Sequence, residues 1–264
     1  MVESKQEIEK VPEVEVVSKA KQRARRLNRG AYWLGKNWLT VFNTFMGLLI
    51  IGPWFAPVFM QLGLETPARI IHLFYQTLCH QYPQRSYFLF GEQTMYSLEE
   101  IALVWDDVQN PFVIRQFIGT PEMGWKVAWS DRMISMYGGI WLFGVIYALP
   151  FVRYRMKPLS VIGLIICCIP MGIDGITHVI SDFAGFGQGF RYHNLWLAEL
   201  TNYAFSESFY AGTVIGSFNW WARLFSGLIF GLGVVWFCYP YVEESFEISN
   251  RAIKRKFDKA GLEI

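Results

Sequence analysis

The hydrophobic and polar residues of this chain are arranged as long apolar runs separated by shorter mixed segments. A helix needs about 20 residues to cross the hydrocarbon core of a bilayer, which is about 30 Å thick. Four runs meet this length, at residues 39–60, 133–152, 159–180 and 222–242. The pattern predicts an all-α integral membrane protein with about four transmembrane helices.

Proline and glycine interrupt several of these predicted spans. Pro53, which follows a glycine, predicts a kink or an early helix end in the first span because proline removes a backbone donor. Pro170 interrupts the third span. The fourth span carries a ridge of small residues that permits close approach of another helix: Gly227, Gly231 and Gly233.

The segments between the predicted spans also contain helical patterns. Residues 61–132 and 182–221 are expected on the extracytoplasmic side, where short amphipathic helices lie in the membrane interface. The pattern leaves open whether residues 61–132 include a re-entrant segment. The expected elements are a helix from Pro67 to about Gln81, a capping box at Ser97 and Glu100 that begins a helix ending before Pro111, a turn-rich loop at residues 185–190, and a helix at residues 195–200.

Composition and charge support the membrane assignment. The chain is 53% hydrophobic and 17% aromatic, with a formal net charge of +2. Most of its 24 Lys and Arg residues lie in residues 1–37, 153–157 and 244–264, and such residues are retained on the cytoplasmic side. We therefore expect a cytoplasmic N-terminal tail (1–37, disordered and then basic), a four-span domain (38–243) and a basic cytoplasmic C-terminal tail (244–264).

Ionisable residues near the outer ends of the spans are the candidate functional groups, because charge within a membrane is costly and tends to mark function. Asp174 is the only acidic residue inside a predicted span, and His178 follows one helical turn later. Arg132 and Arg223 begin the second and fourth spans. These side chains are expected to converge at the depth of the polar stretch CHQYPQR, residues 79–85.

Two interpretations of this convergence stay open. The groups form either a polar clasp between helices or a site for acid-base chemistry or ligand capture. A metal site is disfavoured because the sequence has no HExxH, no CxxC and no paired-His spacing, and the sequence leaves any cofactor unknown. The catalytic candidates are His80, Arg85, Arg132, Asp174 and Arg223, and the weak metal candidates are Cys79, His80 and His178.

Four motifs carry a resemblance to a known family: CHQYPQRSYFLFGEQ (79–93), DRMISMYGG (131–139), PMGIDGITH (170–178) and GSFNWWARLFSGLIFG (216–231). Together they resemble the bacterial and archaeal membrane proteins called domain of unknown function 2085, over about residues 68–242. The resemblance implies a multi-pass protein of the cytoplasmic (inner) membrane with no established activity. It draws attention to Cys79, His80, Arg85, Arg132, Tyr137, Asp174, Asn219 and Arg223.

The chain departs from the family pattern in its second motif. The resemblance implies a cysteine just before the arginine, whereas this chain reads WSDRM, with Ser130 and Met133 beside Arg132. The departure weakens any metal or redox role of Cys79 and favours a structural or accessory protein.

The sequence therefore favours a non-enzymatic membrane component, structural, accessory or lipid-binding, with a polar cluster at the outer leaflet. The alternative is a membrane-embedded enzyme acting on a lipid, isoprenoid or quinone at the extracytoplasmic face. Transport is disfavoured because four spans leave little room for a pathway without oligomerisation. The expected partners are the lipid bilayer and either other membrane subunits or further copies of the chain; nothing indicates nucleic-acid binding.

Overall fold

The structure, a computed structural model, describes residues 11–264, with side chains from residue 19 onward. It is mostly helical and divides into two compact units. One consists of the chain up to Val41 together with Tyr241–Ile264, and the other is Phe42–Pro240. The predicted predominance of helix is confirmed.

The first unit pairs parts of two long helices, α1 (Val11–Ile51) and α12 (Phe218–Lys259). Within it the indole of Trp38 donates to a Glu243 carboxylate oxygen at 2.9 Å and stacks on Phe246. Arg29 donates to the backbone carbonyl of Glu263 at 2.8 Å. Helix therefore extends into both predicted tails, and residues 1–10 of the N-terminal tail lie outside the described residues.

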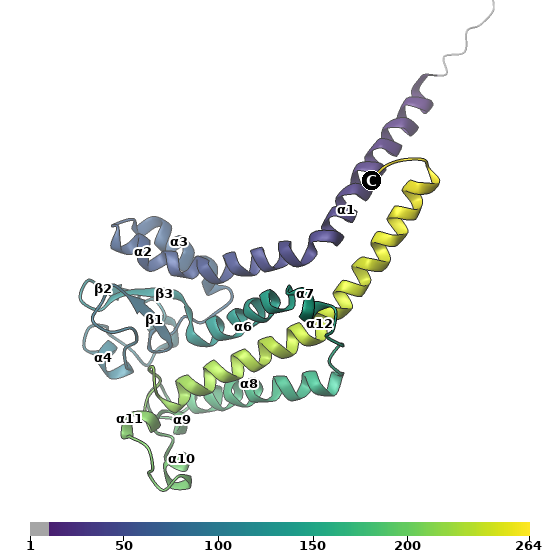
Figure 1. The fold of residues 1–264 in the computed structure, drawn as a ribbon. Helices are drawn as coiled ribbons and strands as arrows, with labels where there is room; N and C mark the ends of the chain where they lie inside the picture. Colours follow the sequence, from purple (N-terminus) through teal and green to yellow (C-terminus); the bar gives the residue numbers. More distant parts are fainter. Residues whose placement is uncertain (1–10) are drawn as a thin grey trace, which may run out of the picture. The chain divides into compact units, whose positions relative to one another are not determined.

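Three helices lie side by side in the second unit (Figure 1): α6 (Asp131–Tyr147), α8 (Val161–Asp182) and the N-terminal part of α12. A Cβ on Gly231 would lie 2.6 Å from the backbone carbonyl carbon of Gly139, so α6 and α12 touch through their backbones. Gly233 packs against the side chain of Cys167 on α8. The predicted role of the glycine ridge is confirmed.

Among the described residues, three helical stretches are long and apolar enough to cross a membrane: Lys19–Gln61, Val161–Asp182 and Phe218–Lys259. They overlap three of the four predicted spans, at residues 39–60, 159–180 and 222–242. The first is broken where Pro53 was expected to break it, by the 3-10 turn η1 (Gly52–Trp54) before α2 (Phe55–Gln61).

The remaining predicted span, 133–152, is not one helix. α6 ends at Tyr147, and the four-residue helix α7 (Pro150–Arg153) follows. Pro150 lacks the N–H that would continue the ladder of α6. With 17 residues, α6 is about 26 Å long, shorter than the hydrocarbon core, so the count of four spans stays a prediction.

The residues between α2 and α6 fold into a small mixed layer at one end of the helices (Figure 1). Its helices are α3 (Glu65–Gln76), η2 (Pro83–Arg85), α4 (Leu98–Ala102) and α5 (Pro111–Ile114). The Ser97 capping box is confirmed, since the Ser97 hydroxyl accepts from the Glu100 N–H and the Glu100 carboxylate from the Ser97 N–H. Helix α3 stops five residues before the predicted end at Gln81, and its position in the membrane interface is still only predicted.

This layer also holds a three-stranded antiparallel sheet, so the all-α prediction is wrong in this region. Its strands are β1 (Ser86–Leu89), β2 (Gly119–Thr120) and β3 (Gly124–Ser130), in the order β1-β3-β2. The central strand β3 buries most of its residues on both faces, so its sequence lacks the alternation that signals a half-buried strand.

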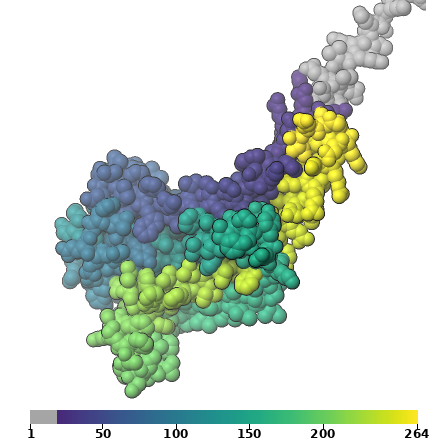
Figure 2. All heavy atoms as spheres, in the orientation of Figure 1, coloured from purple at the N-terminus to yellow at the C-terminus, as the bar shows by residue number. Residues whose placement is uncertain are grey.

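The segment between α8 and α12 forms a lobe that projects from the rest of the unit (Figure 2). It contains α9 (Phe190–His193), α10 (Leu195–Leu200) and α11 (Glu207–Tyr210). The helix predicted at residues 195–200 is confirmed. Asn194, with a backbone φ of 43°, separates α9 from α10, and its buried side-chain amide donates to the carbonyls of Arg191 and Tyr210.

Candidate functional site

Helix α8 supplies the acidic centre of a buried ionic cluster. Both Asp174 oxygens accept from arginine, one from Arg132 at 2.6 Å and the other from Arg191 at 2.7 Å. The second arginine comes from α9 at the start of the projecting lobe. Asp174 is only 5% exposed, so its two partners compensate a carboxylate that is otherwise cut off from water.

A second carboxylate, Asp131, joins α6 to α12. One of its oxygens accepts from Arg223 Nε at 2.7 Å, and the other from the backbone N–H of Arg132 at 2.7 Å. Arg223 is 1% exposed and also donates to the Thr213 carbonyl at 2.7 Å. The Asp131–Arg223 pair therefore connects the start of α6 to α12, and Arg223 also connects α12 to the loop that precedes α12.

Arg85 brings the polar stretch 79–85 into the same cluster. It is held by the turn η2 and donates to Asp182, at the end of α8, at 2.7 Å. Burial by itself lowers the pKa of Arg85, but the nearby Tyr192 and Asp182 outweigh that effect and raise it above the usual value. The cluster thus contains four guanidinium groups and three carboxylates, an excess of one positive charge: Arg85, Arg132, Arg191 and Arg223 against Asp131, Asp174 and Asp182.

Cys79 and Lys126 make hydrogen bonds within and next to the polar stretch 79–85. The Cys79 sulfur accepts from the Gln81 N–H and donates to the Ser130 hydroxyl, both at 3.3 Å. Lys126 on β3 is fully buried and donates to the carbonyls of Gln81 and Arg115. Burial lowers its pKa to about 7, opposed by Cys79 and assisted by the charge of Arg115. These contacts fix the stretch 79–85 to the sheet.

His72 of α3 is also tied to this stretch. Its Nδ1 lies 3.2 Å from the Gln81 side-chain oxygen, and Gln81 donates back to the His72 carbonyl at 2.8 Å. Burial, then the charge of Lys126, lowers the pKa of His72 to about 3. This imidazole is therefore neutral over the physiological range.

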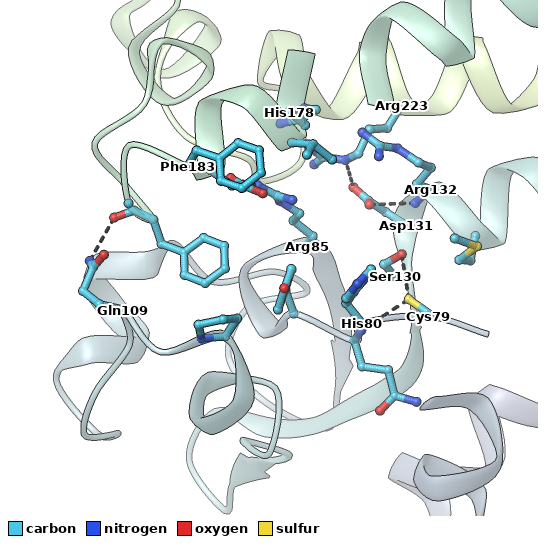
Figure 3. A pocket seen from close by; sticks show the side chains of 18 residues that line it. Cys79, His80, Arg85, Gln109, Ser130, Asp131, Arg132, His178, Phe183 and Arg223 are labelled. Atoms are coloured by element: carbon cyan, nitrogen blue, oxygen red, sulfur yellow. Dashed lines mark hydrogen bonds and ion pairs between the residues drawn. The ribbon is translucent and has the colours of Figure 1, made fainter. Parts of the chain in front are cut away.

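The cluster borders a cavity of about 460 Å³. Figure 3 shows Arg85 entering from one side, while Arg132, His178 and Arg223 extend from the helices on the other. His80 also borders the cavity; it is exposed, and its ring stacks on Tyr82 with centroids 5.4 Å apart. The other charged groups on the wall are Asp131 and Asp182.

The fully buried side-chain atoms of the cavity wall that lack a hydrogen-bond partner are all donors. Arg191 Nη2 lies 3.2 Å from His178 Nε2, and because arginine can only donate, Nε2 accepts and the neutral ring carries its proton on Nδ1. Within residues 19–264, no acceptor pairs with His178 Nδ1 or with three guanidinium nitrogens of the wall: Arg85 Nε, Arg132 Nε and Arg223 Nη1. Such a wall is complementary to a group that only accepts hydrogen bonds, which is an anion.

The structure brings most of the predicted site residues together. Arg132, Asp174, His178, Arg223 and Arg85 share the cluster, and Cys79 and His80 border its cavity. Over the described part of the chain, no group of three or more His, Cys, Asp and Glu side chains is placed to hold a metal ion.

The sequence interpretation missed three members of the cluster: Asp131, Asp182 and Arg191. The sequence could have predicted Asp182, since it lies four residues after His178 and therefore on the same helix face. Asp131 directly precedes Arg132. Arg191 has no signal in the sequence, because only the fold of the loop after α8 returns it to Asp174.

The apolar helices and the buried ionic cluster define a multi-pass membrane protein, and comparisons with known proteins agree. A family model described as "Predicted membrane protein (DUF2085)" matches residues 122–237, which confirms the resemblance and includes three of the four motifs. A Methanocaldococcus jannaschii protein described as "Uncharacterized protein MJ1492" is 27% identical over 162 residues, covering 58% of this chain and 80% of its own length. No solved structure matches.

Proposed function

We propose that this protein is a non-enzymatic, lipid-binding component of the bacterial or archaeal cytoplasmic membrane. Its polar cluster lies at the outer leaflet and binds the anionic headgroup of a lipid. The observation that carries the proposal is that the buried unpartnered atoms of the wall are all donors, around a cavity whose lining arginines outnumber its lining carboxylates by one. A membrane anion supplies both the missing acceptors and the missing charge.

The proposed topology has four spans with both termini in the cytoplasm. α6 is the shortest of them, and the mixed layer and the projecting lobe are extracytoplasmic. Many large apolar side chains on α8 are exposed, including Ile162 at 71% and Ile176 at 62%, as expected for a helix that contacts lipid.

The same contacts argue against the enzymatic alternative. A general base must be free to take a proton, yet Asp174 and Asp131 each use both oxygens to accept from neighbouring groups. His178 Nε2 is likewise engaged by Arg191. His80 is the exposed imidazole at the cavity, so an enzyme working here would depend on it.

Native mass spectrometry of the full-length protein, purified in mild detergent, tests the proposal. We expect an anionic lipid to be retained by the wild type and lost from Arg132→Gln. The matched control is Arg251→Gln, because Arg251 is exposed and pairs with the exposed Glu247. Retention of neutral lipids alone, or lipid turnover that His80→Ala abolishes, would overturn the non-enzymatic lipid-binding assignment.

A further inference from the structure

A second cavity, of about 380 Å³, follows one face of α8. Its wall is apolar apart from a single arginine, Arg132. The helical residues recur at spacings of three and four, which places them along one stripe: Met171, Gly172, Gly175, Ile176, Val179 and Ile180. We name this cavity the α8 groove.

Two residues, Arg132 and Val179, line both the α8 groove and the polar cavity. The two spaces therefore adjoin, with the guanidinium of Arg132 at the junction.

We propose that the two cavities form one binding site for a phospholipid whose phosphodiester headgroup has a net charge of −1, with no cationic group to offset the phosphate. The headgroup lies among Arg85, Arg132 and Arg223, and one acyl chain lies in the α8 groove. This inference rests on the proposed function and extends it by naming the class of lipid and the position of its chain.

Charge selects the headgroup. The cluster carries four guanidinium groups and three carboxylates with a neutral His178, so one negative charge neutralises it. Arg223 and His178 are each 1% exposed and each keeps a nitrogen unpartnered within residues 19–264. A phosphodiester offers oxygen acceptors and one negative charge, whereas a doubly charged group would leave the cluster with an excess of negative charge.

The dimensions of the groove suit an acyl chain. From Gly172 to Ile180 the helix rises about 12 Å, close to half of a hydrocarbon core of about 30 Å. The groove floor is clear because a Cβ on Gly172 would have no heavy atom within 4 Å. One on Gly175 would meet only Arg132, at an ordinary contact distance of 3.8 Å.

The open space at Gly172 provides a clean test. Gly172→Leu places a side chain in the groove without touching the ionic cluster, and leucine is a better helix former than glycine. Gly138→Leu is the matched control, since a Cβ there also meets nothing within 4 Å and Gly138 lies on α6 outside both cavities.

The assay is equilibrium binding to the delipidated, full-length protein in mild detergent, followed by native mass spectrometry. The probes are long-chain phosphatidylglycerol, phosphatidylglycerol with very short chains, phosphatidylcholine and inorganic phosphate. We expect one long-chain phosphatidylglycerol per wild-type chain and unchanged binding to Gly138→Leu. Binding to Gly172→Leu should weaken at least about tenfold, because each buried methylene changes affinity by about fourfold.

The outcomes separate this inference from the proposed function. If Gly172→Leu binds as the wild type does, or short-chain and long-chain lipids bind equally, the chain is not in the groove, although headgroup binding stands. If inorganic phosphate competes as well as the lipid does, the site takes a free anion and the lipid assignment is wrong. If phosphatidylcholine binds as tightly as phosphatidylglycerol, or no probe binds, both proposals fail.

Discussion

Replacing Asp174 with asparagine is the most direct test of the ionic cluster. The substitution keeps the size of the side chain but removes the negative charge shared by Arg132 and Arg191, whose nitrogens lie 2.6 and 2.7 Å from its two oxygens. The asparagine oxygen accepts from one of them, and the amide nitrogen cannot accept from the other. The excess positive charge of the cluster rises from one to two.

The magnitude follows from the burial of the site. Breaking a buried ion pair by removing one partner costs about 3–5 kcal/mol, and Asp174 is 5% exposed. Asp182 is the matched comparison, because it holds one arginine and is 19% exposed. A single charged hydrogen bond is worth about 1.5–3 kcal/mol, so Asp182→Asn is expected to cost roughly half as much as Asp174→Asn.

Thermal unfolding in detergent, followed by the fluorescence of the 11 tryptophans, measures both variants. Adding Arg132→Gln to Asp174→Asn returns the excess positive charge from two to one, so we expect the double variant to be at least as stable as Asp174→Asn alone, with a coupling energy above about 1 kcal/mol. A cost below about 1 kcal/mol for Asp174→Asn, or strictly additive effects, would refute the buried-cluster reasoning.

Three further predictions concern packing, pH and topology. Gly231→Ala should destabilise the protein by about 1–3 kcal/mol, because its Cβ would lie 2.6 Å from the α6 backbone, whereas Gly172→Ala should not; equal thermal midpoints would contradict the contact. The pKa of Lys126 is about 7 in the folded protein and 10.5 without burial, so the unfolded chain binds more protons between these values and stability rises with pH there, by up to about 1.4 kcal/mol per pH unit. Lys126→Met should lack this rise when thermal midpoints are compared from pH 6 to 9. In intact cells an impermeant maleimide should label Glu122→Cys and leave Ser249→Cys unlabelled; the reverse pattern would invert the topology.

Much of the candidate site was predictable because its signals are local. Asp174 stands alone as an acidic residue in an apolar run, and helical spacing places His178 on the same face. Arg132 and Arg223 lie at the starts of apolar runs, so the hydrophobic pattern alone predicts how deep each arginine lies in the membrane. These residues do meet in one cluster.

The sheet and the contact of Arg191 with Asp174 were not predictable in this way. β3 is a strand because β1 and β2 pair with it, and its neighbours on both faces bury the residues that alternation would otherwise expose. Arg191 reaches Asp174 only because the loop after α8 folds back on the helix, a long-range arrangement that no local pattern encodes.

By itself the sequence determined a mostly helical membrane protein, the helix break near Pro53 and the convergence of charged residues around Asp174, since hydrophobicity, proline chemistry and helical periodicity act over one or a few turns. The tertiary structure decided the pairing of each arginine with its carboxylate, the excess of one positive charge and the cavity beside the α8 groove. Those properties depend on distances between residues far apart in the chain, and only packing sets such distances.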